Sequence, residues 1–360
     1  MRKSFLFSVV LILILVCSCT QKPNLIIPTR DVDYRNKSEI TLKGKPVCKD
    51  IIGAERMLVM DTLLIIACNN PESQLMVYST NTDTLVGAFC TRGRAGSEFL
   101  RLYSTTEQCY HDENNHVIVP LVDFMSEIKE VDVTESLNKK HAVIRNTADI
   151  MPFVDALTVF LDNDLDNRFL YEHAVTYAHE EEYGTVHDLD LSRVPVRIST
   201  QKNGGEMKEI PLLRRQVDVD DERHVIMPYS ATIKKHPQRN LILLECINMD
   251  YLIFLDLDDM DRSFAIHQKG SATFDDPYQY SEPFFLGSTI TSDYLFVLYY
   301  QSGLTLPELM VFDWSGNLVR SFRMDMDIFG MAYDEIHHKL YCFNATEDLY
   351  CYDLKGHLDR

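Results

Sequence analysis

The stretch Leu309-Met-Val-Phe-Asp-Trp-Ser-Gly-Asn-Leu-Val-Arg-Ser-Phe-Arg323 decides the fold of this chain. It begins with an apolar strand over 309–313, continues through a polar turn over 314–317 and ends with a second strand over 318–323. Short runs of β-branched and aromatic residues on either side of a turn containing Gly and Asn are typical of a β-hairpin. The stretch therefore predicts two antiparallel strands.

The same pattern recurs along the whole chain. Further hairpins are predicted at 75–89, 127–144, 194–212, 251–267 and 349–358. The second of these has its turn at Thr134–Lys140. The first strands of the six hairpins end near residues 79, 132, 200, 256, 313 and 353. This loose spacing is typical of propeller blades that carry loop insertions.

Two more strands precede each hairpin. The nearer strands are predicted at 63–68, 117–121, 169–173, 241–246, 294–300 and 340–343. The earlier strands are predicted at 56–60, 99–103, 154–161, 231–235, 283–290 and 328–333. Four strands in each of six units predict an all-β fold, a six-bladed β-propeller of four-stranded antiparallel blades. Two separate β-sandwiches are the alternative.

The last unit lacks room for its outer strand, which would begin near His357 in a chain that ends at Arg360. An unpaired strand edge is a liability that folded proteins cover. The segment Glu39–Lys43 alternates like a strand and precedes the first unit. We therefore expect this N-terminal strand to close the ring.

The first nineteen residues resemble the signal of a bacterial lipoprotein. Arg2 and Lys3 precede a short apolar run, and Cys17-Ser18-Cys19 follows it as in a lipobox. The resemblance implies cleavage before Cys19 and lipidation of that residue; a plain signal peptide is the alternative. The predicted domains are a signal peptide at 1–18, the lipidated cysteine with a tether at 19–37, and the propeller at 38–360.

Composition excludes some functions and favours a location. The chain has 360 residues, of which 46% are hydrophobic and 25% charged, as in an ordinary globular protein. Its net charge of −19 argues against nucleic-acid partners and against adhesion to anionic lipid. The sequence contains no second apolar run that is long enough to predict a membrane span. Because no acidic cluster follows Cys19, we expect an outer-membrane lipoprotein that faces the periplasm and is held by its lipid anchor only.

The cysteines predict little chemistry. Cys17 leaves with the signal, Cys19 takes the lipid, and seven others remain. None is spaced as Cys-x-x-Cys, so the sequence predicts no zinc site. Cys342 and Cys351 flank the last hairpin, which makes them a candidate disulfide; small buried apolar residues are the alternative.

One segment carries a family resemblance. Thr91-Arg-Gly-Arg-Ala-Gly-Ser-Glu-Phe99 is similar to the Gly-x-Gly-Pro-Gly-Glu-Phe segment of TolB-like six-bladed propeller lipoproteins of bacterial envelopes. Three residues match it: Gly93, Glu98 and Phe99. Three depart from it: Ala95, Gly96 and Ser97. The resemblance implies a propeller over about residues 38–360 but no activity, because that family is mostly uncharacterised.

The same segment supplies the candidate ligand-binding residues, which are Arg92, Gly93, Arg94, Gly96, Glu98 and Phe99. Guanidinium groups suit an anionic ligand, and glycines allow backbone shapes closed to other residues. We expect such a crossover between blades to lie where the central channel opens. The alternative is structural, with Glu98 and Phe99 fastening the loop into the blade junction.

The sequence contains no recognised catalytic motif, so no catalytic residue is predicted. The leading hypothesis is a non-enzymatic propeller that binds a protein or small ligand in the envelope, with no cofactor. The alternative is a calcium-dependent lactonase- or esterase-like hydrolase in the channel. Its candidate residues would be Asn69, Glu98, Asp123 and Asp293.

Overall fold

The computed structural model describes residues 23–358 apart from short gaps. The longest gaps are 150–155, 162–166, 174–195, 203–207, 215–230, 275–283 and 301–304. Residues 1–22, with the predicted signal peptide and Cys19, lie outside the described residues. Among the described residues, no helix is long and apolar enough to cross a membrane.

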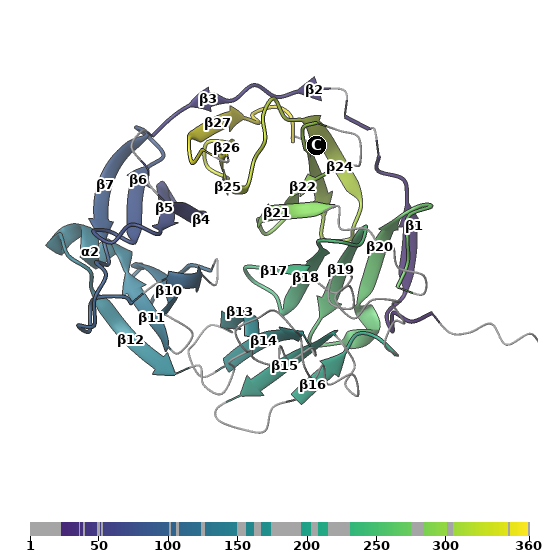
Figure 1. Ribbon diagram of the computed structural model, residues 1–360, viewed down its shortest axis with the longest axis horizontal. Coiled ribbons are helices and arrows are strands. Elements are labelled where there is room, and N and C mark those ends of the chain that lie inside the picture. Colours follow the sequence, from purple (N-terminus) through teal and green to yellow (C-terminus); the bar gives the residue numbers. More distant parts are fainter. Residues whose placement is uncertain are drawn as a thin grey trace, which may run out of the picture.

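The described strands form six sheets, arranged as a ring in Figure 1. The first sheet consists of β4 (Ala54–Met60), β5 (Leu63–Cys68), β6 (Leu75–Ser79) and β7 (Thr84–Phe89). The second consists of β8 (Leu102–Thr105), β9 (Tyr110–His111), β10 (Val117–Asp123), β11 (Glu127–Asp132) and β12 (Ile144–Asp149). The third consists of β13 (Ala156–Leu161), β14 (Asn167–His173), β15 (Val196–Lys202) and β16 (Lys208–Pro211).

The other three sheets each include a strand from the N-terminal segment. The fourth consists of β17 (Ala231–Lys235), β18 (Leu241–Cys246), β19 (Tyr251–Asp256), β20 (Phe264–Gln268) and β1 (Thr29–Val32). The fifth consists of β21 (Phe285–Ile290), β22 (Tyr294–Tyr299), β23 (Glu308–Asp313), β24 (Leu318–Arg323) and β2 (Ile40–Thr41). The sixth consists of β25 (Gly330–Asp334), β26 (Lys339–Phe343), β27 (Leu349–Asp353) and β3 (Lys45–Pro46).

This arrangement confirms the predicted all-β propeller with antiparallel four-stranded blades. Five sheets take four antiparallel strands from one stretch of chain, whereas the sixth takes only three. Its fourth strand, β3, pairs antiparallel with β27. The opening hairpin at 309–323 becomes β23 and β24, with Leu309 opposite Phe322.

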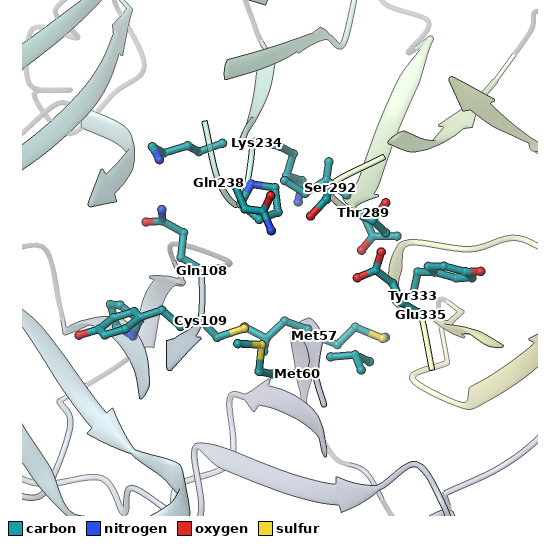
Figure 2. A pocket seen from close by; sticks show the side chains of 18 residues that line it. Met57, Met60, Gln108, Cys109, Lys234, Gln238, Thr289, Ser292, Tyr333 and Glu335 are labelled. Atoms are coloured by element: carbon teal, nitrogen blue, oxygen red, sulfur yellow. The ribbon is translucent and has the colours of Figure 1, made fainter. Parts of the chain in front are cut away.

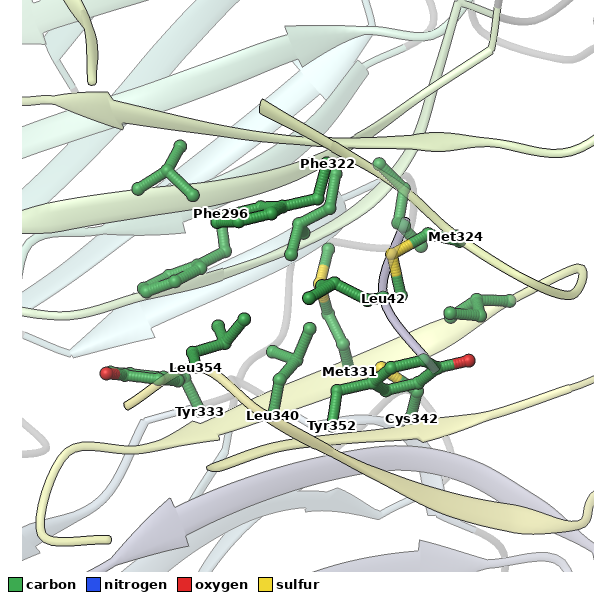
Figure 3. Packing of buried hydrophobic residues seen from close by; sticks show 14 of the residues in the cluster. Leu42, Phe296, Phe322, Met324, Met331, Tyr333, Leu340, Cys342, Tyr352 and Leu354 are labelled. Carbon is green, nitrogen blue, oxygen red and sulfur yellow. The ribbon is translucent and has the colours of Figure 1, made fainter. Parts of the chain in front are cut away.

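Apolar clusters between neighbouring sheets hold the described blades together. Figure 3 shows the cluster between the fifth and sixth sheets, where Phe296, Phe322 and Leu340 are fully buried. Comparable clusters lie between the first and second sheets, the fourth and fifth, and the sixth and first. Because each such side chain contributes about 1.5–3 kcal/mol on burial, these faces provide the main stabilisation.

The described part of the predicted closing segment Glu39–Lys43 lies elsewhere than expected. Within it, β2 pairs in parallel with β24, at the outer edge of the fifth sheet. Leu42 is then buried between the fifth and sixth sheets, where its backbone N–H donates to the carbonyl of Arg323. After Leu42 the chain continues to the sixth sheet, where Lys45–Pro46 pairs with β27.

The described part of the predicted tether at 19–37 is docked on the propeller. Its strand β1 pairs in parallel with β20, and the Tyr34 side chain is completely buried. The buried Asp250 accepts hydrogen bonds from the hydroxyl of Tyr34 and, at 2.8 Å, from the guanidinium of Arg35. The folded body therefore begins before residue 38.

Two further predictions, a turn and a disulfide, are wrong. The expected turn at Thr134–Lys140 is instead helix α2 (Val133–Lys139), because Asp132 caps its N-terminus by accepting from the Glu135 N–H at 2.8 Å. A second, 3₁₀ helix, η3 (Met260–Arg262), lies between β19 and β20.

The predicted disulfide between Cys342 and Cys351 is also wrong. The register pairs Cys342 with Tyr350 and Cys351 with Tyr341, so the two cysteines lie on opposite faces of the sheet. They accordingly pack in two different apolar clusters. All seven cysteines of the described residues are free thiols.

Candidate functional site

A cavity lies where the inner strands of four sheets end. It has a volume of about 350 Å³ and is lined from β4, β17, β21 and the end of β25, with further residues from β9 and β10. This volume is within the range of small-molecule sites. Figure 2 shows side chains from these separate strands around one space.

The cavity wall combines apolar and polar groups. Sulfur-containing and apolar side chains form one part of the wall: Met57, Leu58, Val59, Met60, Cys109, Pro120, Pro237 and Ile290. Polar side chains form the rest: Gln108, Tyr110, Lys234, Lys235, Gln238, Thr289, Thr291, Ser292, Tyr333 and Glu335. Polar groups placed among apolar surface can fix the orientation of a small ligand.

Two cavity residues have carboxyl and thiol groups in partly desolvated surroundings. Burial raises the pKa of the Glu335 carboxyl, while a hydrogen bond with Thr291 opposes that rise. Burial also raises the pKa of the Cys109 thiol to about 12, so this thiol stays protonated and is a poor nucleophile at neutral pH.

Lys234 is the most unusual group of the cavity wall. Burial lowers the pKa of its amine to about 7, with a further decrease caused by Arg56, while Glu245 opposes the change. Lys234 and Glu245 lie diagonally on one face of the β17–β18 pair, because Thr232 is directly opposite Glu245. Both side chains are buried, with 6% and 0% of their surface exposed.

One oxygen of the Glu245 carboxyl has a hydrogen-bond partner. The Thr232 hydroxyl donates to its Oε2 at 2.7 Å, and burial raises its pKa. Arg56 belongs to β4 in the first sheet, yet its charge acts on Glu245 in the fourth. Lys234 and Glu245 are therefore a buried charged pair of residues, of which Lys234 lines the cavity, and the exposed Arg56 acts on both from the first sheet.

The predicted ligand segment lies at the other end of the sheets. Ala54 at the start of β4 pairs with Cys68 at the end of β5, and the next residue, Asn69, accepts from the Arg92 guanidinium at 2.7 Å. The cavity instead contacts the later part of β4, from Met57 to Met60. The crossover was expected to lie where the central channel opens. The cavity lies at the opposite end of the sheets from this crossover.

Within that segment, contacts favour the structural alternative. The Glu98 carboxylate accepts from the Ala95 N–H at 2.8 Å and lies against Gly93, where a Cβ would collide with it. The Phe99 ring is completely buried, and the Lys129 ammonium lies 4.8 Å from its centre. These contacts fold the loop onto the junction between the first and second sheets.

The remaining candidates of the segment are on its surface. Arg94 and Gly96 are exposed, and nothing lies within 4 Å of the position that a Cβ of Gly96 would take. Arg92 is exposed as well, although its side chain is bonded to Asn69.

The residues considered for a channel calcium do not converge. Asp123 is paired with the Lys129 ammonium at 2.6 Å and also accepts from the Leu100 N–H. Asp293 is exposed in the turn between β21 and β22, at the cavity end, whereas Asn69 and Glu98 lie at the other end. Among the described residues there is no group of three His, Cys, Asp or Glu side chains that could hold a metal.

Sequence reasoning missed Lys234 and Glu245, although each leaves a signal. Glu245 interrupts the apolar strand Leu241-Ile-Leu-Leu-Glu-Cys246, and Lys234 follows the apolar Ile233 in Ala231-Thr-Ile-Lys-Lys235. A charged residue in a strand that is buried on both faces is rare unless it is paired. Such interruptions would have marked this face of the fourth sheet.

Comparisons with known proteins support the fold alone. No family model and no curated protein matches the chain. A solved protein of Bacteroides fragilis, assigned as exported, has a TM-score of 0.50 at 8% identity, covering 90% of this chain and 98% of its own. A DUF4221 family member from Bacteroides vulgatus has a TM-score of 0.50 at 9% identity, covering 89% and 98%.

Proposed function

We propose that this protein is a non-enzymatic binding module that holds a small molecule in the cavity at the ends of its inner strands. The carrying observation is the cavity itself, whose walls come from several sheets and combine apolar surface with polar groups. A site assembled from separate blades is fixed by the whole ring. Binding there requires no loop to fold first.

We place the protein in the bacterial envelope as part of this proposal. The lipobox at Cys19 and the likeness to an exported propeller support this location. The experiment is metabolic labelling with a radioactive fatty acid, comparing wild type with Cys19→Ser. We expect a labelled membrane protein only in the wild type; equal labelling in the variant would refute the anchor.

The proposal further assumes one closed ring of six blades. The pairing of β3 with β27 supports this closure, because the N-terminal segment completes the sixth sheet and then continues into β4 of the first. Deleting residues 24–47 should lower the melting temperature markedly. An unchanged melting temperature would contradict a closed ring.

The binding test fills the cavity. Thr289 lines it from β21, and Thr289→Trp would occupy much of its space, whereas Thr289→Ser leaves the cavity open. Thermal-shift measurements with a panel of small carboxylic acids, aldehydes, sugars and nucleosides should give stabilising ligands for wild type and Thr289→Ser. A bound ligand at a hundred times its dissociation constant stabilises by about 2.7 kcal/mol.

The decisive comparison is the loss of these shifts in Thr289→Trp while its own melting transition stays cooperative. Ligands that stabilise the Trp variant as strongly as the Ser variant would place binding elsewhere and reject the cavity as the site.

A further inference from the structure

The cavity wall contains a buried amine, that of Lys234, whose surroundings suit covalent chemistry. Lys234 lines the cavity from β17, with its stem buried against the face that the fourth sheet turns towards the fifth. Lys235 lines the same cavity from the opposite face of the strand. Two lysines with different neighbours therefore line one cavity, so the reactivity of one amine can be compared with that of the other.

A lysine becomes a nucleophile when its amine loses its proton near neutral pH. Burial and a second cation are the two influences that favour this state. Lys234 has both, since it is almost completely buried and the Arg56 charge acts on it. Glu245 opposes the effect, but burial favours the protonated, neutral form of that carboxyl too.

We propose that Lys234 binds carbonyl compounds, such as small aldehydes or keto acids, by forming a reversible imine within the cavity. This inference rests on the proposed function and names the class of ligand. It follows from the placement of a buried amine, diagonally across the sheet from Glu245, in the wall of a cavity of about 350 Å³.

The chemistry is balanced without any further reactant. The amine lone pair attacks the carbonyl carbon, and the carbonyl π electrons move to its oxygen. The resulting carbinolamine then loses water, which carries away the carbonyl oxygen and the two amine protons. A carbon–nitrogen double bond remains, and hydrolysis by water reverses every step.

The walls suit the rest of such a ligand. Thr289 and Ser292 offer hydroxyl groups, and Gln238 offers an amide that both donates and accepts. Met57 and Met60 offer flexible apolar surface to a short carbon chain.

The test is reductive trapping on the purified full chain at pH 7, with propanal and pyruvate as probes and sodium cyanoborohydride as hydride donor. Hydride reduces the imine to a stable secondary amine, which peptide mass spectrometry assigns to a residue. We expect labelling of Lys234 at least about tenfold above that of Lys235, because only a deprotonated amine reacts.

Two variants make the result specific. Lys234→Arg keeps a long basic side chain and removes the reactive amine, so labelling at position 234 should vanish. Lys235→Arg should leave the labelling of Lys234 unchanged. Cooperative thermal unfolding of both variants shows that each is folded.

The outcomes separate this inference from the proposed function. Binding that Thr289→Trp abolishes, together with unlabelled Lys234 or uniform labelling of all lysines, overturns the imine and leaves the cavity as the site. Absence of both cavity binding and Lys234 labelling overturns both.

Discussion

Two buried lysines, one at each end of the sheets, show how the same residue type serves two purposes. Lys129 lies at the predicted segment, where its ammonium contacts the Asp123 carboxylate at 2.6 Å, donates to the Glu98 carbonyl at 2.8 Å and faces the Phe99 ring. Lys234 lies at the other end, beside a cavity and diagonally across from Glu245. The first lysine holds the loop at Glu98 and Phe99 against the second sheet, whereas the second lines a cavity that a ligand can fill.

This difference teaches that a motif and a site need not coincide. The segment that carries the family resemblance is used for packing between the first two sheets. The cavity is built from residues without any motif, supplied by strand ends that are far apart in sequence. Four predictions test this contrast.

The largest expected effect comes from removing the structural lysine. Lys129→Met should lower the free energy of unfolding by about 3–5 kcal/mol, because it removes the ammonium that contacts the buried Asp123 carboxylate at 2.6 Å. Lys234→Met should cost less than about 2 kcal/mol, because the remaining Glu245 carboxyl can take up a proton. Urea unfolding of both variants at pH 7 measures the difference, and equal losses would remove the contrast.

The next effect is a pH dependence specific to Lys234. Its pKa is about 7 in the folded protein against 10.5 for an ordinary lysine, so the unfolded chain binds more protons between these values. Stability must therefore rise with pH across that window, whereas the penalty for charging the buried amine is fully present below it. The pKa of Glu245 is raised, so its own contribution instead falls as pH rises above 4.5.

Relative to Lys234→Met, the wild type should gain about 1–2 kcal/mol of unfolding free energy between pH 7 and 9. Denaturation series on both proteins at matched ionic strength give this value. A constant difference across the range would show that the folded Lys234 stays protonated.

A smaller effect is expected at the glycine of the predicted segment. In Gly93→Ala the new methyl group displaces the Glu98 carboxylate, which then loses its hydrogen bond with the Ala95 N–H. The loss should be about 1 kcal/mol, with ligand affinity unchanged. Denaturation and ligand titration of the same variant check both parts; a weakened affinity would return the segment to the binding site.

The smallest effect belongs to the exposed arginines. Arg92→Ala breaks one exposed hydrogen bond to Asn69 and should change stability by less than about 0.5 kcal/mol. Arg94→Ala serves as its control, since that side chain is exposed. A loss of ligand binding in either variant would revive the prediction that these cations hold an anion.

Periodicity predicted the strands well because buried strands leave a strong local pattern. The inner and second strands at 63–68, 231–235 and 241–246 have the predicted bounds, as does the hairpin strand at 251–256. The helix over Val133–Lys139 was missed because its start depends on the Asp132 side chain, which also ends a strand. Local pattern alone does not show which role such a residue takes.

The N-terminal segment and the site were harder to predict, since both depend on tertiary contacts. Ile40–Thr41 has a strand pattern, but its partner β24 lies near the far end of the chain. The role of Asp250 in holding Tyr34 likewise appears only after folding. For the cavity, Met57, Lys234 and Thr289 share no sequence spacing, because only the packing of their separate sheets brings them together.

The most direct test of the central claim is calorimetric titration of one stabilising ligand into Thr289→Trp and Gly93→Ala, with wild type beside them. The account predicts wild-type affinity for Gly93→Ala and a loss of at least about a hundredfold for Thr289→Trp, whose cavity is filled. Undiminished affinity in Thr289→Trp with a weakened Gly93→Ala would contradict it and place the ligand at the segment around Arg92.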